Sequence, residues 1–171
     1  MSDDPALPGI PARVTGVLMT EESIYGLLLV SGMIVVSHNL VGTSLNALLT
    51  VVVTVIVFFL AHVFAGTLAR LAATEGLAGL RGAIGGAVHH SRGMLLVSVV
   101  PLAILLLGVT RVFDDEAAIW TALLVDVVIL GVLGWLAVAR WSPSVWLRVA
   151  SSLITAGFGV IVTLLKVLIH H

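Results

Sequence analysis

Charged side chains are the scarcest feature of this sequence. Only 10% of the 171 residues are Asp, Glu, Lys or Arg, whereas hydrophobic residues make up 60%. A soluble domain has about 25% charged residues, because water must hydrate its surface. A surface with so few charges is suited to lipid instead of water. The composition therefore excludes an ordinary soluble domain and predicts an integral membrane protein.

Cysteine is absent altogether, which excludes disulfides, thiolate metal ligands and a cysteine nucleophile. The formal net charge is −1, so no basic excess favours nucleic acid as a partner. The sequence also lacks the Gly-x-Ser-x-Gly and His-Glu-x-x-His motifs, and we expect no enzymatic activity. Nearly all basic residues are Arg, a bias typical of GC-rich genomes, so we expect the plasma membrane of a bacterium.

Five apolar stretches are long enough to cross a hydrocarbon core of about 30 Å, which takes roughly 20 helical residues each. They cover residues 23–41, 46–69, 94–110, 117–139 and 149–169. Such stretches must be helices, because lipid offers the backbone no hydrogen-bond partners and the sequence lacks period-two alternation. The predicted fold is an all-α integral membrane protein with a bundle of about five transmembrane helices.

The distribution of arginine predicts the orientation of this bundle. Two connections contain five of the arginines: Arg70, Arg81, Arg92, Arg140 and Arg148. The positive-inside rule places both connections in the cytoplasm, so the N-terminus is inside and the C-terminus is outside. Residues 1–22 are then a cytoplasmic tail, since they open with Asp3 and Asp4 and contain three prolines, where a signal peptide needs positive charge followed by an apolar run.

The longest connection, residues 71–93, has two possible interpretations. Leu77, Leu80, Ile84 and Val88 recur at helical spacing, which is typical of an amphipathic helix lying in the cytoplasmic headgroup layer. The same segment contains many glycines, each of which costs about 1 kcal/mol in a helix interior. A flexible glycine-rich loop is therefore the alternative.

Ionisable residues inside the predicted spans are the main indication of function, because a charge at the bilayer centre costs at least ~2.5–3.5 kcal/mol. Asp126 lies ten residues after Glu116, or roughly 15 Å along the helix, which is close to the midplane. His62 and Ser31 fall at a similar depth by the same arithmetic, so the three side chains are expected to share one layer. A carboxylate, an imidazole and a hydroxyl at one level suit proton relay or the binding of a small cation.

Each of these residues also has a purely structural interpretation. Asp126 and His62 can instead hydrogen-bond to each other or to hydroxyl groups and fix the packing of the helices. Glu22 is a candidate for the inner mouth of a transport path, but an acid at the start of a helix also complements the helix dipole. His89 and His90 are adjacent and point about 100° apart on a helix, so a metal site shared by both is not expected.

The last third of the chain resembles a known family. Residues 133–140 (LGWLAVAR), a short turn at 142–144, Arg148 and the glycine-containing stretch at 156–159 are similar to the closing helix pair of the vacuolar iron transporters. The resemblance implies a five-span, dimeric protein that exchanges divalent metal for protons. In this chain the first span has no acidic residue and the second connection has only Glu75, so no metal-site residue is assigned from the resemblance.

These observations favour a transporter or channel for a small cation that acts as a homodimer in the lipid bilayer, with coupling to protons as one option. Asp126 is the expected central charge, His62 its proton or ligand partner, Ser31 a lining residue and Glu22 an acid at the inner mouth. The alternative is a non-transporting helical subunit or scaffold that binds a partner protein, in which the same polar residues only fix the packing. The sequence indicates no particular cofactor or metal.

Overall fold

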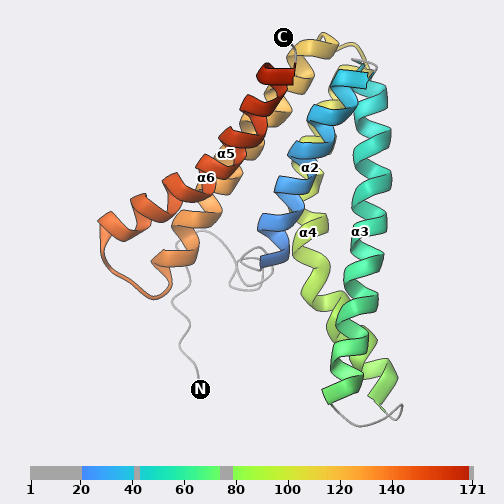
Figure 1. The fold of residues 1–171 in the computed structure, drawn as a ribbon, viewed down its shortest axis with the longest axis vertical. Coiled ribbons are helices and arrows are strands. Elements are labelled where there is room, and N and C mark those ends of the chain that lie inside the picture. The colour runs from blue at the N-terminus through green and yellow to red at the C-terminus, as the bar shows by residue number, and fades with distance from the viewer. Residues whose placement is uncertain (1–20, 41–42, 74–78, 170–171) are drawn as a thin grey trace.

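The computed structural model describes residues 21–40, 43–73 and 79–169, and within these ranges the fold is entirely helical (Figure 1). Most of the predicted tail, residues 1–20, lies outside the described residues. The five helices, which keep the labels of Figure 1, are α2 (Glu21–Leu40), α3 (Ser44–Ala73), α4 (Leu80–Val109), α5 (Asp115–Ala139) and α6 (Val145–Ile169).

Four of these helices are long and apolar enough to cross a membrane: α3, α4, α5 and residues 145–165 of α6. Their outward surfaces are rich in exposed aliphatic and aromatic side chains, which on α3 include Leu49, Val53, Ile56, Val57, Leu60 and Phe64. Such surfaces are unfavourable in water and favourable in lipid. The chain is therefore a multi-pass helical membrane protein, as the composition predicts.

Within the connection between the second and third predicted spans, residues 80–93 are helical, which agrees with the helical interpretation and not with a flexible loop; residues 74–78 lie outside the described residues. Residues 80–93 form the first half of α4 and continue directly into the predicted third span. One glycine of this segment lies in the contact of α4 with α3: Gly86 lies against the side chain of Arg70, and nearby Gly66 of α3 lies against Ala87. These close contacts offset the helix-weakening effect of glycine, which local propensity alone does not reveal.

The helices α3 and α4 are therefore unusually long for a single membrane crossing. Each has 30 residues, or about 45 Å of helix at 1.5 Å per residue. Helix α2 has 20 residues, or about 30 Å, which matches the hydrocarbon core. In Figure 1 the α3–α4 hairpin accordingly extends beyond the first turn of α2.

Helix α2 occupies the centre of the bundle, because it packs against all four of the other helices. Helices α5 and α6 form a second hairpin that diverges from the α3–α4 hairpin toward one end of the molecule (Figure 1). The last turn of α3, the first turn of α4 and the α5–α6 connection lie at that end, together with the start of α2. The α4–α5 connection and the last turns of α2 and α6 lie at the opposite end.

The α5–α6 hairpin is held by a close approach of the two backbones. At Gly134, an added Cβ would lie 2.7 Å from the backbone carbonyl oxygen of Ser151 on α6, and it would also overlap the Thr155 hydroxyl. Only glycine permits this separation. Small residues at helix interfaces are typical of membrane bundles, where close packing replaces the hydrophobic effect between helices.

At the opposite end, a carboxylate from α5 caps the start of α3. The backbone N–H of Ser44 donates a hydrogen bond of 2.9 Å to Asp115 Oδ1. The first N–H groups of a helix lack partners within the helix, and a carboxylate there also complements the helix dipole. This contact ties the start of α3 to the start of α5.

Candidate functional site

The carboxyl group of Asp126 lies in the interior of the bundle and is bonded to the central helix. Asp126 is fully buried on the inner face of α5. Its Oδ2 accepts a hydrogen bond of 2.8 Å from the hydroxyl of Ser31, which is also buried, on α2. Its other oxygen, Oδ1, is buried and has no hydrogen-bond partner among the described residues. Half of the carboxyl group is therefore unsatisfied.

The sequence places Asp126 on this face by simple helical periodicity. The buried residues of α5 recur three or four positions apart, and Asp126 takes one place in the series Ile119, Ala122, Leu123, Asp126, Leu130 and Leu133. On α2, Ser31 holds the equivalent place in the series Leu27, Val30, Ser31, Ile34 and Val35. Each polar residue thus interrupts an otherwise apolar face.

Two apolar clusters enclose the Ser31–Asp126 pair along the length of the bundle. The first cluster joins Val30 and Ile34 of α2 to α3, α4 and α5, on the side of the α4–α5 connection. The second joins Leu27 of α2 to Val97, Leu130 and Leu133, on the side where α2 begins. Buried side chains therefore lie on both sides of the pair. This arrangement is that of an enclosed polar position between two hydrophobic layers.

Such a position has a limited chemistry. An ionised carboxylate in an apolar interior is unfavourable unless a proton, a cation or several hydrogen bonds compensate it. Ser31 supplies one hydrogen bond, and Oδ1 is available for a proton or for direct contact with a cation. The pair can thus exchange a proton or hold a small cation that has lost part of its water.

His62 makes its contacts within its own helix. Its Nδ1 lies 3.1 Å from the backbone carbonyl oxygen of Phe58, one turn earlier on α3. Because a carbonyl oxygen only accepts, Nδ1 carries the proton of this bond. The ring also packs against that of Phe58, with centroids 4.5 Å apart.

The depth of His62 also differs from the predicted layer. Gly66 of α3 lies against Ala87 of the antiparallel helix α4, so His62, one turn before Gly66, is level with His90, about one turn after Ala87. His90 pairs with the first turn of α2, whereas Ser31 lies nine residues later, or about 13 Å along the helix. The structure therefore brings together Asp126 and Ser31 of the predicted layer and separates His62 from them.

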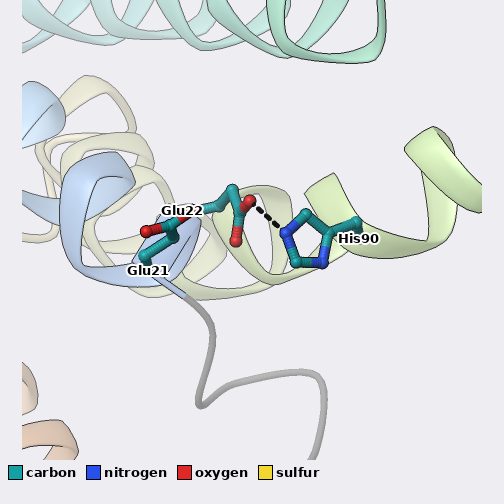
Figure 2. A group of neighbouring side chains, drawn as sticks. All are labelled: Glu21, Glu22 and His90. Atoms are coloured by element: carbon teal, nitrogen blue, oxygen red, sulfur yellow. Dashed lines mark ion pairs between the residues drawn. The ribbon is translucent and has the colours of Figure 1, made fainter. Parts of the chain in front are cut away.

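Glu22 lies at the start of α2, as predicted, but it is not simply a solvated capping residue. Its side chain is only 6% exposed, and Oε1 lies 2.7 Å from Nε2 of His90 on α4 (Figure 2). Its second oxygen, Oε2, is buried without a hydrogen-bond partner among the described residues. The contact with His90 could not be predicted from the sequence, because 68 positions separate the two residues.

Comparison of the chain with models of known protein families, with curated proteins and with solved structures finds no match. The resemblance of residues 133–159 to the vacuolar iron transporters therefore stays a prediction from the sequence.

Proposed function

We propose that this protein is a membrane transporter or channel for a small cation, in which Asp126 is the central charged group and Ser31 its polar neighbour. The observation that carries this proposal is the enclosed Asp126 carboxyl, with one oxygen bonded to Ser31 and the other without a partner in the described part of the chain. A purely structural polar contact is expected to satisfy both oxygens, because an unsatisfied buried polar atom costs about 1–3 kcal/mol. A group retained at that cost suits a binding role.

The apolar clusters on both sides of the pair support an occluded state of such a transporter. A continuous open pore would let ions leak, whereas an enclosed site requires the helices to move before an ion enters or leaves. Proton coupling fits the same group, because a carboxyl that releases a proton when a cation binds keeps the buried charge balanced. His62, level with the start of α2, is then a residue near the inner end of the path instead of a direct partner of Asp126.

We also propose five membrane spans, with α2 as the fifth, and an N-terminus in the cytoplasm. The length of α2 supports the fifth span, and the positive-inside rule supports the orientation. The end of α3, the start of α4 and the α5–α6 connection lie at one end of the bundle (Figure 1). That end is the arginine-rich one, while the acidic residues Asp114, Asp115 and Glu116 follow the turn at the other end.

The proposal is tested by ion flux into liposomes that contain the purified protein. A proton gradient or a gradient of monovalent or divalent cation is imposed, and uptake is followed with a dye. We expect flux with the wild-type protein and its loss with Asp126→Asn. Asn keeps the shape of Asp and still accepts the hydrogen bond from Ser31, so the fold is expected to persist while the charge is removed. Wild-type liposomes no leakier than protein-free ones would contradict the proposal.

A second candidate function is a non-transporting membrane subunit or scaffold. The observation that favours it is the exposed surface of α6. In the apolar stretch of this helix, only 6% is buried within the chain. Large exposed residues point outward along its whole length, among them Trp146, Leu153, Phe158 and Leu164. A second copy of the chain or another membrane protein would cover this surface. Retained partner binding or dimerisation with Asp126→Asn, together with no wild-type flux, would support this alternative.

A further inference from the structure

A second group of ionisable side chains lies about 13 Å from the Ser31–Asp126 pair, at the base of α2, and it has the composition of a metal site. Glu21 and Glu22 come from the first turn of α2, and His90 comes from α4 (Figure 2). One ligand atom from each, two carboxylate oxygens and one ring nitrogen, lie within 4.8 Å of one another. We propose that Glu21, Glu22 and His90 bind a divalent transition-metal ion.

The burial of Glu22 is the observation that separates this group from an ordinary surface cluster. One of its carboxylate oxygens contacts His90, and the other is buried with no partner among the described side and main chains. A contact with one imidazole leaves a buried carboxylate half satisfied, which is unfavourable. A metal ion between Glu22, His90 and Glu21 would satisfy this oxygen or replace the present contact with a stronger one.

The distances require only small movements of exposed side chains. Two ligand atoms about 2.1 Å from a tetrahedral metal ion are about 3.4 Å apart. The 2.7 Å contact between Glu22 and His90 would therefore open slightly, and Glu21 would move toward them. Both movements are available, because Glu21 is exposed and the side chain of His90 is 52% exposed. Glu22, held in the interior, is the fixed member of the group.

The ligand types indicate which ions fit. Imidazole together with carboxylates suits Mn²⁺, Fe²⁺, Co²⁺ and Zn²⁺, whereas Mg²⁺ and Ca²⁺ prefer ligands that are all oxygen. Three protein ligands leave at least one coordination position for water, as in sites that exchange their ligand. The two carboxylates also offset the positive end of the α2 dipole, which would otherwise repel a cation.

Equilibrium binding of Zn²⁺ to the whole chain tests the proposal independently of transport. Protein without an affinity tag, in detergent micelles, is titrated with Zn²⁺ in excess Mg²⁺ by isothermal titration calorimetry. We expect the wild type to bind Zn²⁺ at this site, and Glu22→Gln, His90→Gln and Glu21→Gln each to weaken binding by about tenfold or more, since even the loss of supporting residues around a metal costs 10–100-fold.

The matched control is His89→Gln, because His89 is an exposed neighbour of His90 on the same helix and points elsewhere. We expect this variant to bind Zn²⁺ like the wild type. Glu22 is buried, so circular dichroism and size exclusion must show that Glu22→Gln is folded; His90→Gln, at a half-exposed position, gives the same test without that concern. The proposal is overturned if the wild type binds no Zn²⁺, or if His89→Gln and His90→Gln have equal effects.

Discussion

The hydrogen bond between Ser31 and Asp126 makes a quantitative prediction about stability. The change is Ser31→Ala, which removes the only hydrogen bond to the Asp126 carboxyl among the described contacts. Both carboxyl oxygens would then be buried without partners. We expect this variant to be less stable than the wild type, although the substitution deletes only one oxygen atom.

The expected size of the effect follows from the partners involved. Leaving a buried polar group unsatisfied costs about 1–3 kcal/mol, and more if the group is charged. Hydrogen bonds between membrane helices measured by double-mutant cycles average only about 0.6 kcal/mol, because the unfolded chain in a micelle also finds partners. Because Asp126 is enclosed between two apolar clusters, we expect Ser31→Ala to cost more than that average, about 1–2 kcal/mol.

A double-mutant cycle isolates this contribution. Unfolding in mixed micelles is measured for Ser31→Ala, Asp126→Leu and the double variant. Once Asp126 is Leu, Ser31→Ala should cost almost nothing, because no carboxyl remains to be left unsatisfied. Ser98→Ala is the control: Ser98 is equally buried, but its hydroxyl donates to the Met94 carbonyl oxygen of its own helix. If Ser31→Ala costs the same in both backgrounds within about 0.5 kcal/mol, the reasoning is refuted.

Two further predictions concern the packing of the hairpins. Gly134→Ala should lower the thermal unfolding temperature, because the new methyl group meets the backbone oxygen of Ser151. Such overpacking costs about 1–3 kcal/mol. The control is Gly157→Ala, which should leave that temperature unchanged or raise it, because an added Cβ there has nothing within 4 Å. Asp115→Ala should also lower it, since removing a capping carboxylate such as the one on the Ser44 N–H costs about 1 kcal/mol. An unchanged unfolding temperature in either Gly134→Ala or Asp115→Ala would show that the corresponding contact contributes nothing in the micelle.

The membrane character and most of the helix positions could be predicted from the sequence, because they depend on long apolar runs. The predicted span at 117–139 lies within α5, and the one at 46–69 lies within α3. The sequence could not decide between a helix and a loop at the start of α4. Its glycines weaken a helix locally, and the compensating contacts of Gly86 and Ala87 come from residues of α3 that are distant in the sequence.

The residues of the candidate sites also include some whose position could be predicted from the sequence and some whose position could not. Asp126 and Ser31 stand out in the sequence because each is a polar residue in an apolar run, and depth along the helix was enough to suggest that they meet. His62 stands out for the same reason, but its depth was counted from Arg70 as if that residue marked the membrane boundary. Helix α3 continues to Ala73 as part of a hairpin longer than the hydrocarbon core, so this count placed His62 in the wrong layer.

The central position of α2 links the two sites that the structure defines. Glu22 and Ser31 are both buried on this helix, and each uses one bond to a different partner helix, α4 for Glu22 and α5 for Ser31. Between them lies the apolar cluster around Leu27. A cation bound at Glu22 would therefore have to pass this cluster to reach Asp126, and a shift or rotation of α2 relative to α4 and α5 is the movement that would open it.

Because one rigid helix, α2, carries both polar groups, such a movement would change the contacts of Glu22 and of Ser31 together. Zn²⁺ binding at Glu22 should then alter the accessibility of Asp126, which hydrogen exchange or carboxyl labelling measured with and without Zn²⁺ would detect, and equal labelling in both conditions would show that the two sites are independent.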